Sequence, residues 1–305
     1  SDYPPLRGAP LARVAPRHHL RDPPTFDGVA SAACAPDGEV ERTAATAGSG
    51  AELVISRIPG MRIAVAGGGA AWPTRGVACG GYLVTTEGFR LLLDPGYGTM
   101  VGLPEGLRAS DIDAVFVSHG HPDHCADLHP LLRARVLESG GGPPLPVYAL
   151  PGALDRVLDL DGLGELDGAV DLTEFTAGDQ FEIGPFRALT RPLPHFVPNA
   201  GIRLELGGAS LAYTGDTGPD RGIVDLAAGV DTLIAEATFP SRVPDRFQPY
   251  LSTAAEAARN ATLASVGRLV LTHLWPTSDP EAALSSARDH YAGEVLLARP
   301  GLELG

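Results

Sequence analysis

The stretch VFVSHGHPDHCADL, residues 115–128, places three histidines and two aspartates directly after a short apolar run. The chain has only nine histidines in 305 residues, so three within six positions is an unusual concentration. Imidazole and carboxylate groups suit zinc and neighbouring divalent metals, and a loop leaving a rigid strand can aim several of them at one ion. A polar surface loop would explain a lone His-x-His pair. The longer pattern formed by His119, His121, Asp123 and His124 favours a metal site.

Three further polar side chains follow apolar runs in the same way. His195 stands in RPLPHFVPNAG, Asp216 in LAYTGDTG and His273 in RLVLTHLWP. Each of them alone would be an ordinary turn residue. Together with the histidine-rich stretch, they are better explained as additional metal ligands, each at the end of a strand.

The segments SHGHPDH, YTGDTG and LVLTHL, in this order, resemble the metallo-β-lactamase-fold hydrolases across residues 61–305. The resemblance implies an α/β fold, a four-layer αββα sandwich of two mixed β-sheets flanked by helices, with the site at the sheet edges. It also implies two divalent metal ions, zinc first, with manganese or iron as alternatives. The ligand sets that it implies are His119, His121 and His195 for one ion, Asp123, His124 and His273 for the other, and Asp216 between them.

Other segments narrow the resemblance to the ribonuclease-Z-like branch, which includes small bacterial phosphodiesterase-type members. These segments are LLLDPGYG, EIGPF, AEATF and LARPGLEL. The sequence departs from ribonuclease Z in several motifs, and in two of them a histidine is missing. Ala235 replaces the first histidine of a His-Glu-Ala-Thr motif, and Tyr250 stands where relatives show a histidine before a Leu-Ser or Leu-Thr pair.

Two cations about 3.5–4 Å apart lower the pKa of bound water and supply a hydroxide nucleophile. Asp123 is expected to orient that nucleophile and accept a proton as well as to ligate. We therefore expect a hydrolase, first a phosphodiesterase acting on small phosphodiesters such as cyclic nucleotides. A lactonase or thioesterase is the alternative. A tRNA 3′-processing endonuclease and a non-catalytic metal-binding sensor rank below these two.

Three residues outside the ligand set have two open interpretations each. The phenol of Tyr250 could donate a hydrogen bond or a proton to the substrate, or it could pack at a loop edge. Glu236 and Asp94 could each orient a ligand histidine, since such histidines usually donate their second N–H to a carboxylate or carbonyl. Glu236 could equally satisfy local backbone groups, and Asp94 could cap a turn.

The amino-acid composition limits which substrates and partners we expect. The formal net charge is −14, and all 23 basic residues are arginine. The electrostatic field of a protein with this net negative charge repels polyanions. We therefore expect a small-molecule substrate rather than a long nucleic acid. Three scattered cysteines, no apolar run of about 20 residues and no secretory layout at the N-terminus predict a cytoplasmic protein without a membrane span. The family resemblance also suggests a homodimer.

The amino-acid composition and the periodicity of the chain change near Met61. Residues 1–60 are rich in proline, alanine and glycine with little periodicity, which predicts an N-terminal extension. Residues 61–305 predict the hydrolase domain. Within it, a strand hairpin with a turn at Glu87–Gly88 comes early, and strands alternate with helices towards the end.

Overall fold

The computed structural model describes residues 60–139, 142–161, 164, 166 and 168–305. The predicted extension over residues 1–60 therefore lies outside the described residues, apart from Gly60. In the part that is described, the strands form two sheets of seven strands each. The first sheet has the order β14 (Glu303–Leu304), β1 (Arg62–Gly67), β2 (Gly81–Thr86), β3 (Phe89–Leu93), β4 (Ala114–Phe116), β5 (Leu145–Ala149) and β6 (Val170–Glu174).

The second sheet repeats the pairing pattern of the first. Its order is β7 (Gln180–Ile183), β8 (Phe186–Leu193), β9 (Asn199–Leu206), β10 (Ala209–Tyr213), β11 (Thr232–Glu236), β12 (Arg268–Thr272) and β13 (Glu294–Leu297). In each sheet, the first three pairings in these orders are antiparallel and the last three are parallel. Both sheets are therefore mixed, as the sequence predicts.

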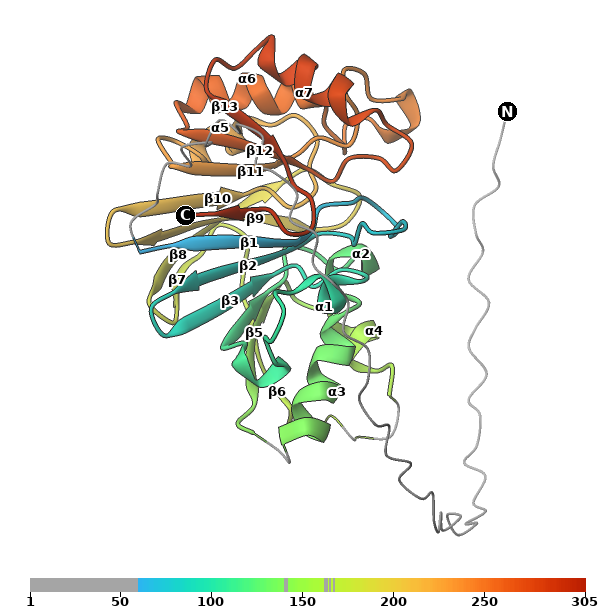
Figure 1. Ribbon diagram of the computed structural model, residues 1–305, viewed down its shortest axis with the longest axis vertical. Helices are drawn as coiled ribbons and strands as arrows, with labels where there is room; N and C mark the ends of the chain where they lie inside the picture. Colours follow the sequence, from blue (N-terminus) through green and yellow to red (C-terminus); the bar gives the residue numbers. More distant parts are fainter. Residues whose placement is uncertain (1–59, 140–141, 162–163, 165, 167) are drawn as a thin grey trace, which may run out of the picture. The chain divides into compact units, whose positions relative to one another are not determined.

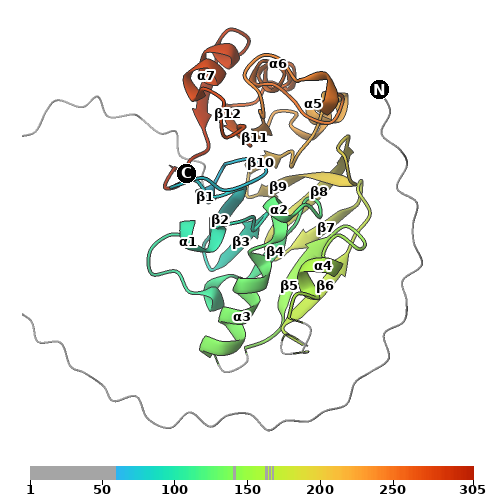
Figure 2. The ribbon, with the colours of Figure 1, turned by 90° about the vertical axis from the view of Figure 1, so that its right-hand side faces the viewer.

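Helices cover the outer face of each sheet (Figures 1 and 2). The part of the chain before β6 carries α1 (Thr99–Gly102), α2 (Pro122–Cys125), α3 (Leu128–Ser139) and α4 (Asp155–Leu158), and the part after β10 carries α5 (Arg221–Leu226), α6 (Ala254–Ala264) and α7 (Pro280–Arg288). Two short 3₁₀ helices, η1 (Ala109–Asp111) and η2 (Asp245–Phe247), lie in connections.

Three buried apolar clusters hold these layers together. One lies between the sheets, and the other two join each sheet to its own helices. The sequence of β4 is apolar throughout because both faces of the strand are buried. Phe116 faces the other sheet, whereas Val115 packs with Leu131 of α3. A strand buried on both faces reads as a continuous apolar run rather than an alternating one. The predicted four-layer αββα sandwich is confirmed.

The topology brings the ends of several strands to one edge. Strands β3 and β4 run parallel, so Asp94 and Ser118 leave the first sheet at the same edge. Strands β10, β11 and β12 are parallel as well, and Asp216, Glu236 and His273 lie at or just after their carboxyl ends. Ligands in open α/β sheets bind at the carboxyl ends of such strands.

A candidate dinuclear metal centre

The seven predicted ligand side chains meet at this edge. His119 and His121 lie in the connection that follows β4, and Asp123 and His124 lie in α2. The stretch expected to be a turning loop is therefore partly a single helical turn, with Pro122 as its first residue. Proline is favoured at that position because its missing N–H has no partner within a helix. The other three ligand residues, His195, Asp216 and His273, follow β8, β10 and β12.

One group consists of three histidines. His121 Nδ1 lies 3.1 Å from His119 Nε2 and 3.0 Å from His195 Nε2. Bonds of about 2.1 Å from a tetrahedral zinc ion would place its ligand atoms roughly 3.4 Å apart. The spacing of these three nitrogens suits one ion.

The second group combines two carboxylates with two histidines. Asp123 Oδ2 lies 3.5 Å from His124 Nε2 and 3.3 Å from His273 Nε2. Asp216 Oδ1 is 3.2 Å from His124 Nε2, and Asp216 Oδ2 is 3.1 Å from His273 Nε2. These four side chains surround a second position, and the spacing of their ligand atoms also suits one ion.

Asp216 connects the two groups. Its Oδ2 also lies 3.9 Å from His119 Nε2 and 3.7 Å from His195 Nε2, so one carboxylate borders both positions. The geometry gives Asp216 the bridging place that the resemblance implies.

Two buried atoms of the cluster have no hydrogen-bond partner, namely His124 Nε2 and Asp216 Oδ1. Both residues are almost fully buried. A buried polar atom without a partner is costly in free energy, and a bound ion is one of its ordinary explanations. Because both atoms face the second position, the residues fit a bound divalent cation.

Asp94 fixes the orientation of two histidines. Its Oδ2 accepts the Nδ1–H of His124 at 2.8 Å and the hydroxyl of Ser118 at 2.5 Å. Ser118 Oγ in turn lies 3.0 Å from His119 Nδ1 and can accept a hydrogen bond from its N–H. The carboxylate also accepts the hydroxyl of Tyr213 from the second sheet at 2.7 Å. With Nδ1 carrying the proton, the Nε2 lone pair of each histidine is directed into the centre.

Glu236 performs the same task for His273 through an intermediate hydroxyl. Thr238 Oγ1 donates to Glu236 Oε1 at 2.5 Å and lies 2.9 Å from His273 Nδ1. His195 is held differently, because its Nδ1 lies 3.0 Å from the backbone carbonyl of Tyr250. The contacts of Asp94 therefore favour orientation of a ligand histidine. Glu236 meets both interpretations, because its carboxylate also accepts the backbone N–H groups of Thr217 and Ser252.

The histidines of the two groups differ in the direction in which their pKa values are shifted. Burial lowers the pKa of His119, His121 and His195, so these rings are neutral and have free lone pairs. Burial also acts on His124 and His273, but the carboxylates of Asp216 and Asp123 outweigh it and raise the pKa of both. The two carboxylates are correspondingly held ionised, with pKa values below their ordinary range.

Tyr250 lies at the margin of this centre. Its ring packs against Phe196 with centroids 4.8 Å apart, and Phe196 contacts the His195 ring at 5.2 Å. The residue is 37% exposed. This packing and the carbonyl contact with His195 place Tyr250 beside a ligand, and its catalytic role stays a prediction.

Sequence reasoning did not find Ser118, Thr238 or Tyr213. For two of them, the position in the sequence next to a predicted residue could have indicated the role. Ser118 directly precedes His119, and Thr238 follows Glu236 by two residues, the spacing that puts extended side chains on one face. No local sequence pattern indicated Tyr213, because its partner Asp94 lies 119 residues away.

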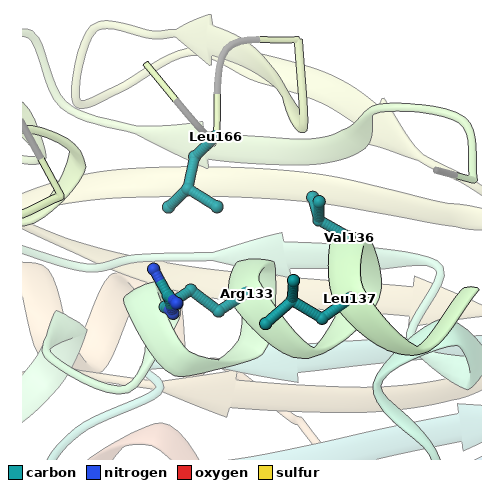
Figure 3. Close-up of a pocket in the computed structure, with 4 residues that line it drawn as sticks. All are labelled: Arg133, Val136, Leu137 and Leu166. Carbon is teal, nitrogen blue, oxygen red and sulfur yellow. The ribbon is translucent and has the colours of Figure 1, made fainter. Parts of the chain in front are cut away.

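A shallow pocket elsewhere belongs to no part of this centre. It lies along α3 and is lined by Arg133, Val136, Leu137 and Leu166 (Figure 3). None of these residues is a predicted ligand.

The sequence profile described as "Beta-lactamase superfamily domain" matches residues 89–274, more than half of the chain. The chain belongs to this superfamily. One member, ribonuclease Z of Methanopyrus kandleri, is 31% identical over 272 residues, which cover 77% of this chain and 94% of that protein.

Two solved structures of the superfamily share the fold over most of their length. The metallo-β-lactamase fold protein YhfI from Bacillus subtilis has a TM-score of 0.72 and 27% identity, covering 80% of this chain and 99% of that one. The short form of human tRNase Z has a TM-score of 0.67 and 26% identity, covering 80% and 98%. The predicted family and enzyme class are confirmed: this superfamily member is a metal-dependent hydrolase.

Proposed function

We propose that this hydrolase cleaves small phosphodiesters, with cyclic nucleotides as the first candidates, at a centre that holds two divalent ions. The observation that carries the proposal is the position of Asp216, whose Oδ2 borders both ligand groups at 3.1–3.9 Å. Zinc is the first candidate for both ions, because the donors are five histidines and two carboxylates, and manganese or iron would fit as well.

When bound, such ions lower the pKa of water to give a nucleophile near neutral pH and stabilise the negative charge that develops on the substrate. The side chains of the chain supply the other functions. Asp123 is ionised and lies at the surface of the cluster with 12% of its side chain exposed, so it can accept a hydrogen bond from the attacking water and orient it. Asp94 and Glu236 keep the ligand histidines in one orientation.

Phosphodiester chemistry is supported by the relatives, since a ribonuclease acts on phosphodiester bonds of RNA. A small substrate is supported by the net charge of −14, which disfavours a long polyanion but tolerates a monoanion. Ribonuclease Z activity is the less favoured assignment here, because Ala235 replaces the first histidine of its His-Glu-Ala-Thr motif.

A carbonyl hydrolase, either a lactonase or a thioesterase, is the second candidate. The specific observation is the half-exposed Tyr250 beside His195. A phenol placed there could donate a hydrogen bond to a carbonyl oxygen, which develops negative charge during attack by water.

The test is a substrate panel with defined metal content. Protein loaded with zinc or with manganese is assayed on cyclic AMP, bis-p-nitrophenyl phosphate, a precursor tRNA and a set of lactones. We expect turnover of the small phosphodiesters, and loss of at least a hundredfold in kcat in Asp123→Asn. Turnover of lactones with no phosphodiester cleaved would contradict the proposal. Tyr250→Phe separates the candidates further, because a catalytic phenol lowers kcat whereas a packing residue leaves kcat and KM unchanged.

A further inference from the structure

A second cavity lies at the edge of the sandwich that carries the metal centre. Its volume is about 400 Å³, and its walls come from the β1–β2 connection, the β12–α7 connection and the end of β13. Figure 1 shows the first two connections at the same end of the sandwich as α2. The apolar part of its lining includes Trp72, Val77, Leu274, Trp275 and Leu297.

The walls of this cavity are continuous with a metal-ligand loop. The backbone N–H of His273 donates to Gly68 O at 2.9 Å, and Gly69 forms a bridge with Leu274. The N–H of Trp275 donates to the carbonyl of Thr238 at 2.9 Å. Because the hydroxyl of Thr238 orients His273, the cavity wall and the ligand are fixed by the same residue.

Two tryptophans form the aromatic part of the wall. Their rings meet edge to face, with centroids 5.0 Å apart and an interplanar angle of 84°. Trp275 is supported from behind by Phe239, whose ring is nearly parallel at 5.7 Å. Trp72 remains 44% exposed. An exposed aromatic ring that contacts Trp275, two residues after His273, offers a flat surface on which a planar group can stack.

We propose that this cavity binds a planar aromatic part of the substrate, which in a cyclic nucleotide is the base. The proposal rests on the proposed function, because it assigns the non-reacting part of a small phosphodiester to a place next to His273. The volume lies within the 300–1,000 Å³ of ordinary ligand pockets, and a mostly apolar lining with a few polar groups is typical of them.

The polar groups of the lining favour a base over an acyl chain. Ser278, Glu281 and Arg299 border the cavity and provide a hydroxyl, a carboxylate and a guanidinium. A heterocyclic base has ring nitrogens and exocyclic groups that can accept or donate to such side chains, whereas an aliphatic acyl chain has none.

Tryptophan fluorescence gives a direct test, because Trp72 and Trp275 are the two tryptophans of the whole chain. The full-length protein is titrated with adenosine, ribose 5-phosphate and hexanamide, and the emission is corrected with free N-acetyltryptophanamide. Trp72→Phe and Trp275→Phe each leave one reporter and change little in shape. We expect adenosine to quench or shift the emission of both single-tryptophan variants and the two probes without a base to leave it unchanged.

The kinetic test uses Trp72→Ala with cyclic AMP. We expect KM to rise about tenfold with kcat unchanged, since a stacked base contributes equally to ground-state and transition-state binding. Leu263→Ala, an exposed leucine on α6, is the control and should change neither constant.

The outcomes for the cavity and for the reaction can be told apart. An emission that does not respond to adenosine, or responds equally to hexanamide, overturns the assignment of the cavity even if cyclic AMP is hydrolysed. A response to adenosine in a protein that cleaves no phosphodiester supports the cavity and contradicts the proposed function.

Discussion

Asp94 is the residue on which the largest number of contacts beneath the metal centre converge. It stands at positive φ, 48°, which aspartate tolerates better than most residues, and it accepts from His124, Ser118 and Tyr213. An amide in its place keeps an acceptor oxygen but loses the charge and one acceptor. We expect Asp94→Asn to weaken metal binding 10- to 100-fold.

Competition with a chromophoric chelator measures that affinity. Asp113→Asn is the matched control, because the Asp113 carboxylate also accepts a backbone N–H, from Arg90 at 2.7 Å, but is exposed. Equal affinities in the Asp94 variant and the wild type would show that the carboxylate has no part in holding the ligands.

The two ligand groups should also differ in how pH affects them. The pKa values of His119, His121 and His195 lie below the ordinary 6.5, so these rings bind an ion at pH 7 without losing protons. His124 and His273 have raised pKa values, so their protons must leave when an ion binds, and acid opposes that binding.

We therefore expect one ion to bind with little proton release and the other to bind with release, and we expect the second to bind more weakly as pH falls through the raised pKa values of His124 and His273. Calorimetric titration in buffers of different ionisation enthalpy counts the protons. Identical proton release for both ions would contradict the assignment of charge to the second group.

At the scale of elements, the position of α2 depends on a close approach by Gly96. A methyl group on Gly96 would lie 1.8 Å from the carbonyl oxygen of Asp123. We expect Gly96→Ala to displace α2, to destabilise the fold by about 1–3 kcal/mol and to lower the affinity of the second position at least tenfold. Thermal unfolding and metal titration measure both effects. Gly142→Ala, where a methyl meets nothing within 4 Å, is the control, and equal behaviour of the two variants would contradict this account of α2.

The sequence predicted the hairpin of β2 and β3 but missed two short helices. The hairpin of β2 and β3 was readable because two apolar runs flank a turn in which Gly88 has φ 80°. Helix α5 was not predicted, since six residues are too few to show a helical period, and its visible signal is the capping of Gly222 N by Asp220. Helix α2 was read as a loop for the same reason.

At the scale of the whole molecule, the motifs contained the seven side chains that the fold brings together, but they did not show how those side chains are supported. The strand-end positions were predictable because parallel strands deliver their carboxyl ends to one edge. The contacts between sheets were not, as Asp123 and His273 lie 150 residues apart and no local pattern pairs them. The aromatic cavity also depends on connections that meet only after folding.

Partners and location beyond the site stay predictions. Among the described residues, no helix is both long enough and apolar enough to cross a bilayer. The expected homodimer, the cytoplasmic location and the preference for a small substrate over a long nucleic acid rest on the composition and the family resemblance alone.

The predicted boundary at residue 60 can be tested by truncation. Met61 is 1% exposed and precedes β1, so a chain that begins at Met61 retains the first sheet complete. We expect the shortened protein to unfold at the same temperature as the full chain and to bind the same amount of metal. A lower unfolding temperature would show that residues before Met61 contribute to the domain.

Anomalous scattering from crystals of the zinc-loaded protein tests the central claim most directly. The account predicts two peaks about 3.5–4 Å apart, one among His119, His121 and His195, the other among Asp123, His124 and His273, with Asp216 in contact with both. A single peak, or peaks away from these side chains in fully loaded crystals, would contradict it.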